Sequence, residues 1–148
     1  MSIRDDRIYW QENQMKLYLP SSAVCREIAK RQSIRFSGSE GDFNTGKMSA
    51  ALAWPRMMIT AGTQTDIFDV TVSLFTGILT EKPARQGNAA LAFTLAVLTL
   101  RRNGWMLDLT NDDVLKLHAQ LAKKPVEEVV IAKFFRQKSI PLSFEIDH

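Results

Sequence analysis

Cysteine, long hydrophobic runs and an apolar N-terminus are scarce or missing in this sequence, and each absence excludes a class of protein. The 148 residues include one cysteine, Cys25, so the chain cannot form an internal disulfide bond. The most apolar stretch, residues 89–100, is far shorter than the roughly 18 to 20 residues that cross a bilayer. The first residues, MSIRDDRIYW, lack the apolar core of a secretion signal. These features predict a cytoplasmic protein without a membrane span, although export by a route that needs no signal stays open.

Charged residues of either sign are likewise not concentrated in one part of the sequence. The sequence has 19 Lys and Arg against 16 Asp and Glu, a net charge of +3, and its basic residues are scattered. A pI near 9.2 would permit an acidic partner or a nucleic acid. However, aromatic residues do not alternate with the basic ones, as they do on a surface that stacks nucleic-acid bases. Nucleic-acid binding is therefore not expected.

What the sequence does contain is helical periodicity. Its length and its 45% hydrophobic residues suit a single domain over residues 1–148. Apolar residues recur at helical spacing in about six segments with short connections, which predicts an all-α bundle. The expected helices are Pro20–Ser22 to about Arg31, Lys47–Trp54, Thr65 to about Thr80, Ala89–Leu100, a segment capped within Thr110–Asp113, and Pro125 to about Lys138.

Local signals predict the ends and the inner faces of these helices. Asn44 or Thr45 should cap the second helix, and Pro55 should stop it. Residues 89–100 are apolar at nearly every position, which predicts the buried central helix of the bundle. The residues expected to follow the inner faces are Val24, Cys25 and Ile28; Met48, Ala51, Leu52 and Trp54; Val114, Leu115, Leu117, Leu121 and, at the edge, a packed or half-exposed His118; and Val129, Val130, Ala132, Lys133, Phe134 and Phe135.

The two ends of the chain carry weaker signals. Residues 1–19 are expected to form an N-terminal arm, in which RIYW and KLYL are short β segments or pack on the core. Trp105–Leu109 is expected to be a short extended link. Residues 139–148 alternate well enough to form a strand or an ordered C-terminal tail.

The loop Glu81–Asn88 is the main candidate for a functional site. A glycine-containing loop that opens into a buried helix directs N–H groups at whatever lies above it, a geometry that binds anions. The candidate anion- or nucleotide-binding residues are Lys82, Arg85, Gln86, Gly87 and Asn88. In the simpler alternative, the polar side chains are only exposed loop residues, and Gly87-Asn88 is the turn that begins the helix. Cys25 has no acid or histidine constellation near it in sequence and is expected to be a buried small hydrophobe.

Four short motifs follow one another in an order that is typical of one family. They are Gly41-Asp42, Ala51–Pro55 (ALAWP), Lys82–Ala92 (KPARQGNAALA) and Leu100–Gly104 (LRRNG). Across about two thirds of the chain, this order resembles the Fic/Doc superfamily, and within it the short death-on-curing toxins. The resemblance implies a helical domain whose loop binds nucleotide phosphates. It also implies a histidine base, an acidic Mg²⁺ ligand and basic phosphate-binding residues, which together transfer a phosphoryl or AMP group to a hydroxyl.

The loop departs from the family motif at the positions that carry this chemistry. The base position is Lys82, the metal-ligand position is Gln86, the basic positions are Ala89 and Ala90, and the family's phenylalanine is Ala84, while Pro83, Gly87, Asn88 and Ala92 match. Loss of a general base lowers the rate by about 10² to 10⁴, and loss of a charge-stabilising donor lowers it by about 10² to 10³. The family's catalysis is therefore not expected here, and no residue is assigned as catalytic or as a metal ligand.

Two classes of function follow. The first is a non-catalytic binding or regulatory module of toxin–antitoxin or effector type, which needs no cofactor and binds a protein such as an antitoxin-like peptide, a toxin or a host factor. The second is a transferase of altered chemistry, or an active death-on-curing-type toxin that modifies a protein hydroxyl and requires a nucleotide with Mg²⁺. A deep cleft with convergent polar groups above Gly87 would favour the enzyme, and a filled or flat surface would favour the binder. The sequence does not predict the oligomeric state.

Overall fold

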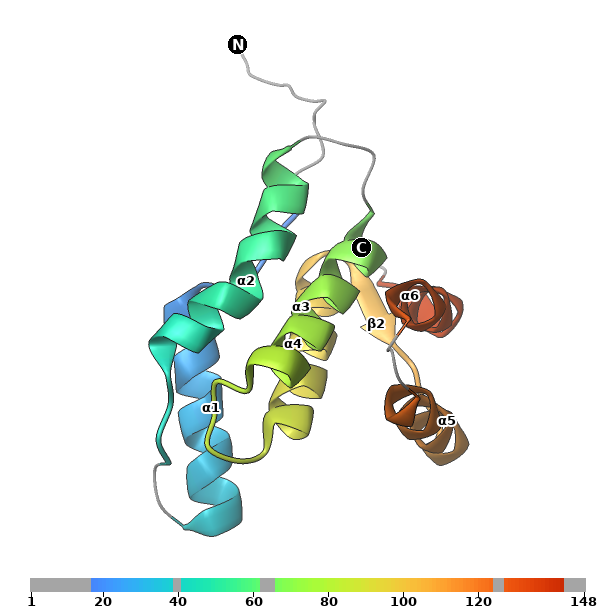
Figure 1. Cartoon of the computed structure of the whole chain (residues 1–148). Helices are drawn as coiled ribbons and strands as arrows, with labels where there is room; N and C mark the ends of the chain where they lie inside the picture. The colour runs from blue at the N-terminus through green and yellow to red at the C-terminus, as the bar shows by residue number, and fades with distance from the viewer. Residues whose placement is uncertain (1–16, 39–40, 62–65, 124–126, 143–148) are drawn as a thin grey trace, which may run out of the picture.

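The computed structural model describes residues 17–38, 41–61, 66–123 and 127–142, and they form a helical bundle with one short pair of strands (Figure 1). The elements are α1 (Ser22–Ser37), α2 (Thr45–Thr60), α3 (Ile67–Glu81), α4 (Asn88–Arg102), β2 (Trp105–Leu107), α5 (Asn111–Ala122), α6 (Glu128–Gln137) and β3 (Ser139–Pro141). The predicted all-α fold is confirmed. None of the helices in these ranges is long and apolar enough to cross a membrane.

Helix α3 is the centre of the bundle. It packs against α2, α4 and α6, and Figure 1 shows it between α1 and α2 on one side and α5 and α6 on the other. Side chains from Ile67 to Ile78 are buried around nearly its whole circumference. The prediction that the helix at 89–100 is buried on all sides was wrong, because Ala89, Ala90 and Leu98 of α4 are exposed. Alanine loses little free energy by facing water, so an apolar segment can still have an open side.

Helix α2 continues through the proline that was expected to stop it. Asn44 caps its start by accepting a hydrogen bond from the N–H of Lys47 at 2.9 Å, as predicted. Pro55 lies inside the helix and is buried. An interior proline costs about 3 kcal/mol, and packing of Pro55 and Ile59 on the core offsets that cost. Trp54 lies on the side of α2 away from the buried residues and is 61% exposed, so its predicted burial was also wrong.

Helix α1 extends to Ser37, six residues beyond its expected end near Arg31, and is closed by Gly38 in the left-handed conformation with φ 79°. Its inner face differs from the prediction by one position. Val24 is exposed, whereas Cys25 is fully buried and Ala29 is nearly so. The prediction that Cys25 is a buried hydrophobe is confirmed.

Burial should make Cys25 chemically inert. Desolvation raises the pKa of its thiol from 9.0 to about 11, despite the opposing charge of Arg56, and the thiolate is the reactive form. In the native protein at neutral pH, we expect a disulfide reagent such as DTNB to react far more slowly with Cys25 than with a Leu115→Cys variant, whose position on α5 is 66% exposed. In denaturant both thiols should react at once. Equal rates for the two thiols in the native protein would contradict the buried position.

Both ends of the described chain are tied to the core. The side chain of Asn103 accepts a hydrogen bond from the N–H of Tyr18 at 2.8 Å and donates one to its carbonyl oxygen at 2.9 Å. The described end of the arm, residues 17–19, is thus docked, while residues 1–16, including RIYW, lie outside the described residues. The expected tail strand is confirmed over Ser139–Pro141, which pairs antiparallel with Trp105–Leu107, and residues 143–148 are not described.

Helix α5 begins at its predicted capping signal, whereas α6 begins at Glu128, three residues after the expected start at Pro125. Thr110 and Asp113 form a reciprocal capping box, and Lys138 lies 3.3 Å from the largely buried Asp113 carboxylate. Pro125 falls outside the described residues, and Glu127 occupies the N-cap position of α6 without a side-chain cap hydrogen bond. Burial is confirmed for Leu117, Ala132 and Phe135, but Leu115, His118, Val129, Val130 and Lys133 are exposed. In the described residues only one side of each helix is buried, so fewer positions are covered than the apolar pattern suggests.

Candidate functional site

The candidate loop begins with a sharp reversal at the end of α3. Lys82 adopts the left-handed conformation with φ 52°, and its N–H donates to the carbonyl oxygen of Ile78 at 2.9 Å. This conformation costs a non-glycine residue roughly 1 to 2 kcal/mol. Pro83 is buried immediately after it. At the other end, Gly87 has φ 79° and leads into α4, whose first turn receives no side-chain cap. The predicted turn at Gly87-Asn88 is thus the helix start.

Asn88 holds the loop closed. Its Oδ1 accepts a hydrogen bond from the N–H of Ala84 at 2.9 Å, and its Nδ2 donates to the carbonyl oxygen of the same residue at 2.8 Å. Both polar atoms of the side chain are therefore used within the loop. Asn88 thus acts as a backbone clamp, which gives its side chain a structural role in the loop.

A second set of contacts fastens the loop to the segment before α2. The N–H of Asn44 donates to the carbonyl oxygen of Pro83 at 2.8 Å. The N–H of Arg85 donates to the carbonyl oxygen of Asp42 at 3.1 Å. Phe43 of that segment and Ala84 of the loop form an isolated antiparallel β-bridge. The motif residues Gly41-Asp42 and the loop are thus neighbours in space.

The five candidate residues do not line one common cavity. Lys82, Arg85 and Asn88 line an open cavity of about 710 Å³ that also includes Lys47. Gln86 and Gly87 line a different one of about 380 Å³ between α1 and α4. Arg85 and Gln86 border a third, of about 620 Å³, next to α1. Lys82, at the position of the family's base, and Gly87, in the phosphate loop, thus line different cavities, and Ala84 borders all three cavities.

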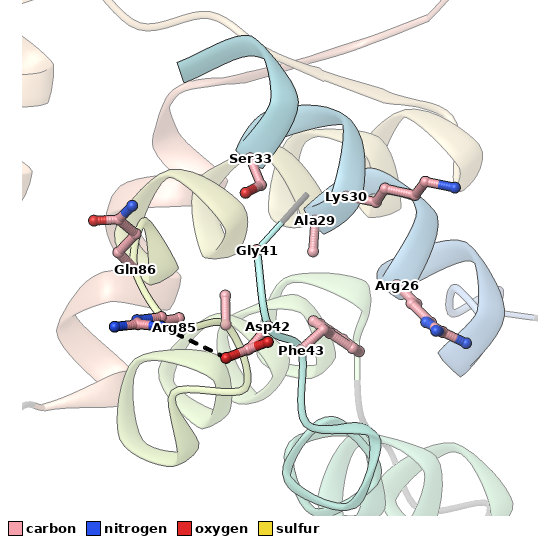
Figure 2. Close-up of a pocket in the computed structure, with 10 residues that line it drawn as sticks. Arg26, Ala29, Lys30, Ser33, Gly41, Asp42, Phe43, Arg85 and Gln86 are labelled. Carbon is pink, nitrogen blue, oxygen red and sulfur yellow. Dashed lines mark ion pairs between the residues drawn. The ribbon is translucent and has the colours of Figure 1, made fainter. Parts of the chain in front are cut away.

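The cavity of about 620 Å³ is lined by basic side chains that were not among the predicted site residues. Arg26 and Lys30 come from one face of α1, together with Ser33. Figure 2 shows that the two basic side chains of α1 extend to one side of the segment at 41–43, whereas Arg85 and Gln86 extend to the other. The i, i+4 spacing of Arg26 and Lys30 was visible in the sequence, but the packing of α1 beside the loop was not.

Arg85 forms the one ion pair drawn in Figure 2. Its Nη1 lies 3.6 Å from Oδ2 of Asp42, and the two side chains are 76% and 89% exposed. Exposed pairs of this kind contribute about 0 to 1 kcal/mol. The pair therefore weakly neutralises Arg85 without fixing its position.

The hollow beside Gly87 is lined by neutral groups. Its lining residues are Ala29, Gln32, Ser33, Ala84, Gln86, Gly87, Ala90 and Leu91. The Nε2 of Gln32 donates to Oγ1 of Thr94 at 2.8 Å, so this amide is engaged with α4. Within the described ranges, no group of three or more His, Cys, Asp and Glu side chains is placed to hold a metal ion. The hollow can accept polar or apolar groups through amide and hydroxyl contacts, but its own side chains offer no acid or base.

The clamp gives a direct prediction for Asn88→Ala. The variant leaves the N–H and carbonyl of Ala84 without these partners, which should lower the free energy of unfolding by about 1 to 3 kcal/mol. The loop should also open more often, so tryptic cleavage after Arg85 should accelerate. Urea denaturation and timed proteolysis measure the two effects.

The control is Gln86→Ala, at an exposed position of the same loop. This variant should change the free energy of unfolding by less than about 0.5 kcal/mol. Equal behaviour of the two variants would contradict the clamp.

Comparisons with known proteins do not assign the chain to a family. No family model matches it, and no curated protein matches it either.

Proposed function

We propose that this chain is a non-catalytic, protein-binding domain of Fic/Doc type, in which the loop before α4 keeps its structural role without transferring nucleotide groups. One observation supports this above all. Lys82, at the position of the family's base, and Gly87, in the phosphate loop, line different cavities. A transferase needs its base and its phosphate site to face the same reacting atoms.

The chemistry of the individual residues supports the same proposal. Lys82 is exposed, so its side chain lies in solvent and not in an enclosed site. Gln86 stands at the metal-ligand position with a neutral amide, and Mg²⁺ prefers carboxylate oxygens and substrate phosphates. Asn88 is engaged with Ala84. The neutral amide of Gln86 and the structural role of Asn88 thus support a loop that does not transfer nucleotide groups.

The partner in this proposal is a protein of the toxin–antitoxin or effector type: an antitoxin-like peptide, a toxin or a host factor. The setting is the cytoplasm. The domain would act by occupying its partner, and its loop would serve to hold the segment before α2 against α4.

Nucleotide binding tests the proposal. Isothermal titration of the full chain with ATP and Mg²⁺ should give no binding heat, and radiolabelled ATP, with label on the α- or γ-phosphate, should label no protein. Binding in the micromolar range would refute the proposal. So would transfer of either label that Lys82→Ala abolishes and the exposed control Lys123→Ala leaves intact.

A second candidate, a transferase of altered chemistry, is favoured by the cavity next to α1. Its volume of about 620 Å³ lies within the range of small-molecule sites, roughly 300 to 1,000 Å³. Arg26, Lys30 and Ser33 would supply charge and hydroxyl contacts to an anionic substrate. Thermal shifts with a panel of anionic metabolites test this. A shift that Arg26→Ala removes would support the enzyme, and the absence of any shift would leave the binding domain as the better account.

A further inference from the structure

Helix α2 presents an uncharged apolar surface to solvent. The residues opposite its buried side are exposed, and together they are called the α2 face: Ala50, Ala53, Trp54, Met57 and Ala61. The core side of the same helix carries Met48, Ala51, Leu52 and Pro55. Helix α2 packs on α1 and α3 with that side, and in Figure 1 it lies at the edge of the bundle.

Two large side chains dominate the α2 face. Trp54 is 61% exposed and Met57 is 56% exposed, and their i, i+3 spacing places them one turn apart on the same side of the helix. Single exposed hydrophobic residues are ordinary, but contiguous ones mark interaction sites. Tryptophan and methionine are also enriched in protein–protein interfaces, where tryptophan often contributes most of the binding energy.

The charged side chains of α2 are both basic and exposed. Lys47 and Arg56 lie on α2 itself, and the helix contains no acidic residue. A partner that covers the α2 face must therefore lie beside the basic side chains of Lys47 and Arg56. Acidic groups at its edge would be attracted, and basic ones repelled.

The size of the surface limits what can bind it. A helix of 16 residues is about 24 Å long, so its outer side accommodates one partner helix along its length. A stable dimer interface buries roughly 800 Å² on each partner, more than the outer side of one alanine-rich helix supplies. A second copy would also place its own basic residues against those of this chain, and like charges repel.

We infer that the α2 face binds an amphipathic helix of a partner protein, with the apolar side of that helix over Trp54 and Met57 and acidic residues beside Lys47 and Arg56. This inference rests on the proposed binding function and names its surface and the chemistry of its partner. A membrane surface fits less well, because shallow alanines make up most of the face, whereas helices that insert into lipid carry bulky apolar residues.

The test uses a displayed library of short helical peptides with leucines at i, i+3, i+4 and i+7, and with Glu, Gln or Lys at the flanking positions. Selection on the immobilised full chain should enrich glutamate-flanked peptides. Anisotropy titrations of the enriched peptides should show at least about tenfold weaker binding to Trp54→Ala, the size of loss expected at a hot spot. Charge reversal at Lys47 and Arg56 should weaken binding several-fold and reduce its salt dependence.

Matched controls come from the far side of the bundle. Leu115→Ala removes a side chain of similar exposure on α5, and Lys133→Glu reverses an exposed charge on α6. Neither should change peptide affinity. Circular dichroism and urea midpoints, expected to be close to those of the parent, confirm that the variants are folded.

Three outcomes would overturn the inference. Selection could enrich no peptide, it could enrich lysine-flanked peptides, or the enriched peptides could bind Trp54→Ala as tightly as the parent. Trp54-dependent sedimentation with phosphatidylglycerol vesicles in the absence of peptide binding would assign the face to membranes. A dimer in light scattering that Trp54→Glu dissociates would assign it to a second copy. Nucleotide binding would refute the proposed function alone, because the α2 face is not among the residues lining the loop cavities.

Discussion

Phe75→Ala is expected to lower the free energy of unfolding by about 3 to 5 kcal/mol. Phe75 lies in the middle of α3, is only 2% exposed, and meets Phe135 of α6 edge to face with ring centroids 5.6 Å apart. Truncation removes apolar burial and leaves a cavity between the central helix and α6, which the helices cannot close without moving. Urea denaturation followed by circular dichroism measures the change.

Two comparisons make this prediction specific. Phe134→Ala truncates a half-buried ring on α6 and should cost clearly less than Phe75→Ala. A double-mutant cycle between Phe75 and Phe135 should give a coupling of about 0.5 to 1.5 kcal/mol. A loss at Phe75 no larger than that at Phe134 would contradict the central position of α3.

The helix starts were predictable because their signals are local. Asn44 caps α2 and Thr110 caps α5 through bonds to N–H groups three residues away. Such contacts lie within one turn, so a sequence contains all the information needed. Asp66, which caps α3 by the same geometry, lies one residue after the expected start at Thr65.

Burial was less predictable, because it depends on which neighbours a helix acquires. The segment at 89–100 is apolar throughout, yet α4 lies toward one side of the bundle and α3 occupies the centre. Val24 and Cys25 are both apolar, and only the packing of α1 against α2 and α4 decides which is covered. Pro55 was expected to end a helix on local grounds, but the packing of its continuation outweighs the local cost.

The candidate site likewise has features that local sequence predicts and features that depend on packing. The turn at Gly87-Asn88 follows from glycine's access to positive φ and was predictable. The clamp from Asn88 to Ala84 is also short-range, but an asparagine before a helix has several possible partners. The cavity beside Arg26 and Lys30 was not predictable, because it requires α1 to lie next to a loop more than fifty residues away. Sequence thus predicts the conformation of the loop better than its surroundings.

Gly77→Val is the second substitution expected to be severely destabilising, at about 3 kcal/mol. A Cβ atom on Gly77 would lie 3.0 Å from the carbonyl oxygen of Ala51 and 3.3 Å from its Cα. Both are backbone atoms of α2, so relief requires the whole helix to shift. Ala51 lies four residues before Pro55, which has no N–H to donate to that carbonyl. Glycine at 77 therefore permits the close approach of α2 and α3 at the point where α2 carries its proline.

Gly77→Ala separates this contact from helix propensity. Propensity alone would stabilise α3 by about 1 kcal/mol, whereas the contact with α2 opposes it, so we expect a net loss and a larger loss for valine. Thr80→Val places a β-branched apolar side chain at an exposed position of the same helix and should change stability by less than about 0.5 kcal/mol. A gain in stability for Gly77→Ala would show that α2 can move away from α3. In that case the outward position of Trp54 would no longer follow from the packing of these two helices.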